Sequence, residues 1–135
     1  MPNKSAPVPP EVLAKLRLIC LGLPEAYEEA AWVGTRWCVA KKNFAHVLMI
    51  ADGWPPAYAR AAGTAGPACV LTFRLPGALT DAARYARAPF FRPVWWPNIA
   101  GMVLDAGADW DEVEGLLTGS YCALAPKRLT SLVDR

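Results

Sequence analysis

The stretch "RWCVAKKNFAHVLMIA", residues 36–51, decides the fold class because it holds two runs of aromatic and β-branched residues. A turn signal at Lys42-Asn43 separates these runs, and a third run, "YEEAAWV" at 27–33, comes before them, ahead of Gly34-Thr35. Runs of this composition and length are typical of β-strands. The sequence therefore predicts three consecutive strands that form a meander.

Side chains alternate along the predicted strands. Trp37 and Val39 share one face of the second strand, whereas Arg36 lies on the other. The stretch "CVLTFRL", residues 69–75, alternates in the same manner and directs Arg74 outward. A strand with one apolar and one mixed face indicates a sheet that is packed on one side only. We therefore expect cations on the outward face of the sheet.

Helical patterns surround these strands and complete the predicted fold. Helices are expected from Pro9 or Pro10 to Gly22, at 78–87, from Asp109 onward and at 126–133, with a strand at 100–106 and a loop at 52–67 that holds one helical turn. Consecutive strands with helices around them predict an α+β domain. The expected architecture is an antiparallel β-sheet with helices packed on one face, in the order α-β-β-β-β-α-β-α-α.

Length and composition predict a single domain. The chain has 135 residues, of which 54% are hydrophobic, so it can bury one sizeable core. Residues 1–8 are rich in proline and offer little to bury, which indicates a flexible N-terminal tail. We expect residues 9–135 to form one domain.

The charge balance restricts the classes of partner. Fourteen Lys and Arg against twelve Asp and Glu leave a net charge of +2, which falls short of a strongly basic nucleic-acid binder. Five of the acids crowd one segment: Asp105, Asp109, Asp111, Glu112 and Glu114. Much of the remaining chain thus carries a basic excess, which is compatible with a basic face.

Cysteine usage and hydropathy predict a cytoplasmic protein that has no metal site and no membrane-spanning segment. The four cysteines, Cys20, Cys38, Cys69 and Cys122, lie in apolar runs without a C-x-x-C pair, so we expect reduced, buried thiols and no metal site. The N-terminus lacks the apolar segment of a signal peptide. No apolar run approaches the roughly 20 residues that span a bilayer.

No constellation of residues indicates catalysis or a cofactor. His46 is the single histidine, and it has no carboxylate or cysteine nearby in sequence to orient it. Glu25, Glu28 and Glu29 cluster around the start of the first predicted strand, which is typical of a solvated turn. Ser120 lacks the glycine setting of a nucleophile elbow. The sequence therefore predicts a non-enzymatic protein, and a small-ligand pocket lined by Trp54, Tyr58 and His46 is the one enzyme-like alternative.

Binding of double-stranded DNA with low sequence specificity is the leading functional interpretation. The residues expected to contact phosphates come from the sheet face, the hairpin, the aromatic segment and the last helix: Arg36, Lys41, Lys42, Arg74, Arg92, Lys127 and Arg128. The stretch "RAPFFRPVWW" at 87–96 interleaves rings with guanidinium groups, which suits base stacking but equally suits core packing. The alternative is a protein-interaction or homodimerisation module that uses the aromatic segment 90–96 as its contact surface.

Several stretches together resemble the MmcQ/YjbR family of small bacterial proteins. The matching pieces are "LRLICLGLPEA", "AWVGTRWCVAKKNFAHV", "LTFRL", the proline-aromatic segment before "GMVLD", and "DWDEVEGLLTGSYCALAPKRL". They span residues 11–133 nearly completely, and their order is distinctive. The residues that match the family pattern are Trp32, Gly34, Phe44, Tyr121, Pro126, Lys127 and Leu129.

The resemblance implies an α+β fold with helices against one side of an antiparallel sheet, a shape likened to type III secretion chaperones and to frataxin-like proteins. It also implies DNA binding through a double-wing surface, without agreed catalytic residues. The sequence departs from relatives at Lys42-Asn43, where they more often have Gly-Lys. Frataxin-like iron binding is not implied, because the first helix has Glu11 as its only acid.

Overall fold

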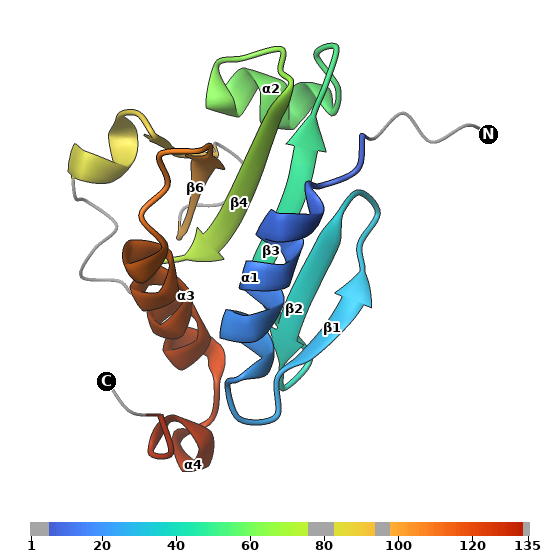
Figure 1. Ribbon diagram of the computed structural model, residues 1–135. Coiled ribbons are helices and arrows are strands. Elements are labelled where there is room, and N and C mark those ends of the chain that lie inside the picture. The colour runs from blue at the N-terminus through green and yellow to red at the C-terminus, as the bar shows by residue number, and fades with distance from the viewer. Residues whose placement is uncertain (1–5, 76–82, 94–97, 134–135) are drawn as a thin grey trace.

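Six strands form one antiparallel sheet in the order β1-β2-β3-β4-β6-β5 (Figure 1). The computed structural model describes residues 6–75, 83–93 and 98–133. The strands are Tyr27–Ala30 (β1), Thr35–Val39 (β2), Lys42–Ile50 (β3), Ala68–Arg74 (β4), Phe90–Phe91 (β5) and Ile99–Leu104 (β6). The predicted meander of the first three strands and the predicted α+β class are both confirmed. Within its described residues, the proline-aromatic segment contributes the short edge strand β5, and the prolines that flank the two phenylalanines lack the backbone N–H that a longer strand would need.

Helices flank the sheet in the expected chain order. They are Pro10–Leu21 (α1), Pro56–Ala62 (α2), Trp110–Leu124 (α3) and Lys127–Thr130 (α4), with a 3-10 helix at Ala83–Ala86 (η2). Much of the helix expected at 78–87 falls in 76–82, which lies outside the described residues. Asp109 caps α3 as predicted, since its side chain accepts the backbone N–H groups of Asp111 and Glu112 at 3.0 and 3.2 Å.

The β2–β3 hairpin turns two residues earlier than Lys42-Asn43, so that prediction was wrong. The turn residues are Ala40 and Lys41, which adopt positive φ angles of 51° and 65°. This conformation of a two-residue turn matches the twist of the paired strands. The Asn43 side chain accepts the backbone N–H of Ala45 at 3.1 Å, where the strand register shifts. Asn43 therefore shapes a β-bulge rather than the turn.

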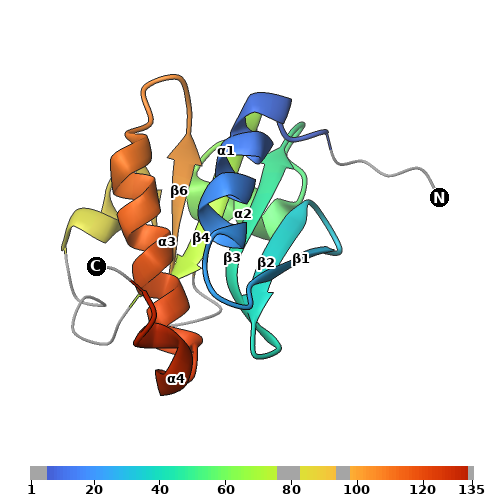
Figure 2. The ribbon, with the colours of Figure 1, turned by 60° about the horizontal axis from the view of Figure 1, so that its bottom comes forward.

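The main core lies between one face of the sheet and the helices α1 and α3, which cross that face side by side (Figures 1 and 2). Trp37 and Val39 point into it as predicted, and both are fully buried. The largest fully buried side chains of this core are Trp37, Tyr121, Phe44, Leu16, Leu71, Met102 and Leu117. Burial of each such side chain contributes about 1.5–3 kcal/mol of transfer free energy.

The opposite face is not left open, which corrects the expectation of a sheet packed on one side only. A second cluster packs there, in which Ala59 of α2 lies with Leu48, Ile50 and Val70 from the neighbouring strands β3 and β4. Val70 is fully buried, although strand alternation placed it on the outward face. A short helix in the expected loop thus covers the end of this face that lies farthest from the β2–β3 turn.

Candidate nucleic-acid interface

The β2–β3 turn presents two cations at one end of the sheet. Lys41 occupies a turn position and Lys42 begins β3, and both side chains are exposed. A positive φ costs a non-glycine residue about 1–2 kcal/mol of conformational free energy. Ala40 and Lys41 both adopt positive φ, so the rest of the fold must compensate for this cost at the turn. The ammonium groups therefore project from a two-residue turn and not from a long, loose loop.

The last helix supplies two more predicted contacts. Leu129 anchors α4 in the main core, which leaves Lys127 and Arg128 exposed. The Arg128 guanidinium donates to both carboxylate oxygens of Glu25, at 2.9 and 3.2 Å. These hydrogen bonds, together with the charge of Arg128, hold the pKa of the Glu25 carboxyl below its ordinary value. Both side chains are more than half exposed, so the pair contributes little to folding.

Arg74 ends β4 between these two elements. Its backbone N–H donates to the Ser120 hydroxyl at 2.8 Å, and that hydroxyl donates to the carbonyl of Phe44 at 2.5 Å. Ser120 therefore ties the C-terminal half of α3, and α4 behind it, to the strands that adjoin the Lys41-Lys42 turn. The Nε of Arg74 is buried and has no hydrogen-bond acceptor among the described residues. An unsatisfied buried donor costs folding free energy, and because this nitrogen is shielded from solvent it does not itself face an external ligand.

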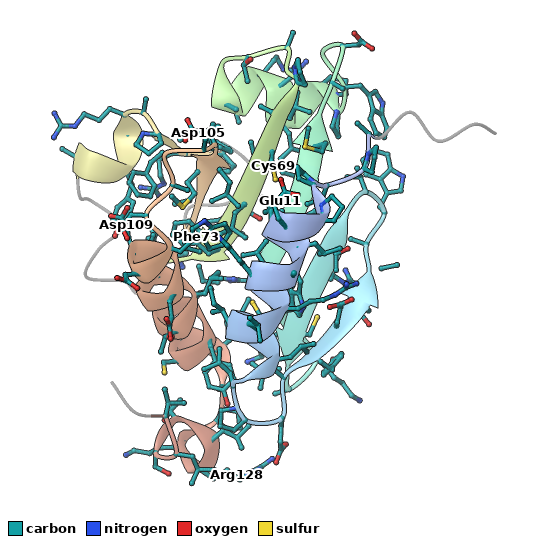
Figure 3. The ribbon with its side chains drawn as sticks, viewed as in Figure 1. Glu11, Cys69, Phe73, Asp105, Asp109 and Arg128 are labelled. Atoms are coloured by element: carbon teal, nitrogen blue, oxygen red, sulfur yellow. The ribbon has the colours of Figure 1, made fainter. Side chains whose placement is uncertain are left out.

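Five of the seven predicted phosphate contacts thus lie at the same end of the molecule. We call this group the basic end, and it consists of Lys41, Lys42, Arg74, Lys127 and Arg128. Figures 1 and 2 show the β2–β3 turn and α4 at this end. In Figure 3, Arg128 lies at the lower end, whereas Glu11, Asp105 and Asp109 lie in the upper half. The three labelled carboxylates are thus separated from Arg128, whereas the Glu25 carboxylate lies directly beside it.

Arg36 and Arg92 lie apart from the basic end. Arg36 sits within β2 opposite His46, and its Nε and Nη2 contact one carboxylate oxygen of Glu29 at 2.6 and 2.5 Å. Arg92 follows the edge strand β5, where its Nε donates to the backbone carbonyl of Ile99 at 3.2 Å. These two guanidinium groups are held by partners within the chain, so they are poorly placed to share one phosphate backbone with the hairpin.

The three glutamates before and in the first strand each bind an arginine. Glu25 holds Arg128 and Glu29 holds Arg36, as described above, while Glu28 accepts Nε and Nη2 of Arg17 at 2.9 Å each. Hydrogen bonds from Arg17, and a further one from the buried indole of Trp37 at 3.0 Å, lower the pKa of Glu28. A lowered pKa favours a permanently charged carboxylate over a proton donor. The geometry suits structural ion pairs rather than acid–base catalysis.

His46 is tied into the structure on both ring nitrogens. Its Nε2 lies 2.6 Å from the carbonyl of Val33, which requires a proton on Nε2, and its Nδ1 lies 3.5 Å from the Tyr58 hydroxyl. Burial lowers the pKa of His46, and the nearby Arg36 charge acts in the same direction. Trp54, Tyr58 and His46 do lie together on the α2 side of the sheet, as the small-ligand alternative requires. The neutral imidazole already serves as a structural link there.

The described part of the aromatic segment belongs to the protein interior. Phe90 and Phe91 are both buried, and the Phe90 ring meets Tyr85 edge-on at 5.1 Å between centroids. Trp95 and Trp96 lie outside the described residues, and with them most of the contact surface that the protein-interaction alternative invokes. Within the described ranges, the large apolar side chains with the greatest exposure are elsewhere, at Leu18 and Trp32.

The cysteines are free thiols, as predicted, and three of them are buried. Burial raises the pKa of Cys20, and it raises that of Cys69 to about 11, so these thiols stay protonated and unreactive. Cys122 is half-buried. Among the residues that the structure describes, no group of three or more His, Cys, Asp or Glu is arranged to hold a metal ion. No helix in the same ranges is long and apolar enough to cross a membrane.

Two residues that shape the site were missed from sequence. Ser120 was considered only as a nucleophile, yet it lies seven positions after the buried Val113, a spacing that returns it to the core-facing side of α3. That spacing could have predicted a buried hydroxyl that forms hydrogen bonds within the protein. Glu25 carried no such signal, because its partner Arg128 lies 103 residues away.

Comparison with known proteins places the chain in a family. No curated protein matches it. The model of one family, YjbR, matches residues 21–123, a span that begins at the end of α1 and reaches nearly to the end of α3. It therefore includes the β2–β3 turn, the end of β4 and Ser120, and it leaves α4 outside. Because this match covers well over half of the 135 residues, the chain belongs to the YjbR family.

Proposed function

We propose that this protein binds the phosphate backbone of double-stranded DNA through the basic end, without catalysis and with low sequence specificity. The observation that carries the proposal is the convergence of three separate elements on one end of the sheet: the Lys41-Lys42 turn, the end of β4 at Arg74, and α4 with Lys127 and Arg128. Lysine and arginine are the usual donors to DNA phosphates. Figure 3 shows Arg128 far from Asp105 and Asp109, which supports the proposal because those carboxylates would repel a polyanion.

The size of the basic end sets the expected strength of binding. Five cations can neutralise at most about five phosphates, and the Glu25 carboxylate competes for Arg128. Neutralising three or four phosphates gives a slope of about −3 in a plot of log affinity against log salt concentration. We expect micromolar binding at low salt that weakens strongly by 200 mM. Binding of chromosomal DNA also requires a cytoplasmic location, which is part of the proposal.

Low specificity follows from the type of contact. Lysine ammonium groups at a turn and at a helix start act as point charges, whereas base readout needs side chains that reach base edges in a groove. Arg74 is half-buried, so its side chain has less conformational freedom than the exposed lysines. We therefore expect Arg74 to orient one phosphate and the lysines to add sequence-independent attraction.

The test is fluorescence anisotropy with a labelled 20-base-pair duplex at 50 and 200 mM salt. The double variant Lys41→Gln/Lys42→Gln should bind about tenfold more weakly at 50 mM salt and show a shallower salt dependence. Its matched control is Arg60→Gln/Arg87→Gln, which removes the same charge from exposed positions on α2 and just before β5. Equal losses in the two variants would mean that net charge alone attracts DNA. Absence of binding by the wild-type protein at tens of micromolar would exclude the proposal.

A further inference from the structure

A pair of tryptophans marks the end of the sheet opposite the basic end. Trp32 lies in the connection between β1 and β2, and the residue is 78% exposed. It contacts Trp54, which follows β3, with ring centroids 5.4 Å apart and planes tilted by 49°. Gly34 has a φ of 76°, and a Cβ there would collide with the carbonyl of Val47, so the connection that carries Trp32 is held tightly against β3.

A carboxylate and a cavity adjoin this pair. A hollow of about 480 Å³ is lined by Ala51, Asp52, Gly53 and Trp54. Ala51 and Trp54 exchange two backbone hydrogen bonds of 3.0 Å around a two-residue turn, in which Asp52 and Gly53 have φ angles of 55° and 73°. The turn is therefore well defined, and it places the exposed carboxylate of Asp52 two residues from the Trp54 ring.

Elsewhere in the chain, a tryptophan ring near carboxylates already binds a cationic side chain. The Lys15 ammonium lies over the ring of Trp110, 5.1 Å from its centroid. Glu11 and Asp105 line the cavity of about 320 Å³ in which these two side chains meet. An indole flanked by carboxylates thus receives an ammonium group at one place in the molecule. At Trp32 and Trp54 the indoles and the carboxylate recur, but no cation from the described residues lies over either ring.

We propose that Trp32, Trp54 and Asp52 form a receiving site for the cationic side chain of a basic peptide segment on a partner protein. Tryptophan is the strongest aromatic partner for a cation, and a guanidinium group stacks on indole as well as pairing with a carboxylate. The exposed carboxylate of Asp52 repels an anionic ligand and attracts a cationic one. The site is independent of DNA binding, because it lies at the opposite end of the sheet.

The probe is a fluorescein-labelled peptide of alternating Gly and Arg, titrated with protein and followed by anisotropy. Cation–aromatic contacts at exposed to partly desolvated sites are worth about 0.5–2 kcal/mol. Trp32→Ala should therefore weaken binding about five- to tenfold, and Asp52→Asn, which keeps a residue that tolerates positive φ, about threefold. Leu18→Ala, at an equally exposed apolar position on α1, and Glu11→Gln, which removes a carboxylate elsewhere, should bind as wild type.

Three results would overturn the proposal. These are equal affinity in all four variants, equal binding of a peptide of alternating Gly and Glu, and no binding of the arginine peptide at 1 mM protein. Sedimentation velocity of the protein alone tests a second copy as the occupant. Self-association that Trp32→Ala abolishes, without any binding of the arginine peptide, would assign the surface to a homodimer contact instead. Circular dichroism of each variant checks that the fold is intact.

Discussion

Ser120 accepts the backbone N–H of Arg74 at 2.8 Å although the two residues are 46 positions apart. The same hydroxyl donates to the carbonyl of Phe44, so one buried side chain satisfies the hydrogen-bonding needs of two backbone groups from neighbouring strands. The linking side chain is fully buried, next to the edge-on contact of Phe44 with Tyr121 at 5.5 Å between ring centroids. It fixes the position of α3, and hence of α4, relative to the hairpin that carries Lys41.

Ser120→Ala should destabilise the protein by about 1–3 kcal/mol, because it leaves a buried N–H and a buried carbonyl without their shared partner. The free energy of unfolding is measured by urea titration. Ser131→Ala serves as the control, since its exposed hydroxyl donates only to the nearby carbonyl of Arg128 and should matter by less than about 0.5 kcal/mol. A Ser120→Ala variant as stable as that control would contradict the role assigned to this hydroxyl.

Gly101→Ala should also be destabilising, for a steric reason. Gly101 of β6 pairs with Phe91 of β5, and a Cβ at position 101 would overlap the Phe91 ring. Overpacking of a buried site costs about 1–3 kcal/mol. The second substitution Phe91→Leu makes room, so the double variant should recover part of the loss in thermal melting. If Phe91→Leu worsens the defect, the ring is not what excludes a side chain at position 101.

Sequence patterns predicted the strands and the long helices well because these elements obey local rules. The alternation that buried Trp37 and Val39 follows from the period of a strand, and Asp109 capped α3 because a side-chain oxygen there satisfies free N–H groups. The hairpin turn was misplaced for a related reason. Asn43 is a frequent turn residue, but its side chain closes a bulge instead, and the less typical Ala40 takes the turn.

Long-range relationships were beyond local reasoning. The covering of Val70 depends on where α2 docks after a loop of proline and glycine residues, which no periodicity specifies. The candidate site shows the same limit. Sequence identified Lys41, Lys127 and Arg128 as candidate contacts, but only the tertiary structure brings them to one end and shows Arg128 bound by Glu25.

Stability should fall as the pH is lowered below about 6.5, in part through His46. Its folded-state pKa lies below the ordinary value, chiefly because of burial, so the unfolded chain binds a proton first as the pH falls. The stabilisation is therefore complete above pH 6.5 and is lost as the pH falls through the folded-state pKa. His46→Gln, which can still donate to Val33, should lose less stability than wild type between pH 7.5 and 5.5 in urea titrations. Identical losses would show that other groups dominate.

Glu25→Gln should increase affinity for duplex DNA about two- to threefold at 50 mM salt, if the basic end binds phosphate as proposed. The substitution frees the Arg128 guanidinium from two hydrogen bonds to the carboxylate and removes a negative charge beside the site. Glu114→Gln is the matched control, because it makes the same change in net charge at an exposed position in the N-terminal half of α3.

A double-mutant cycle with Arg128→Gln then separates local from general effects. If Glu25 acts by occupying Arg128, its substitution should bring little gain in the Arg128→Gln background. An equal gain in both backgrounds would mean that Glu25 repels DNA only through its charge. Arg128 would then bind phosphate, if at all, without competition from this carboxylate.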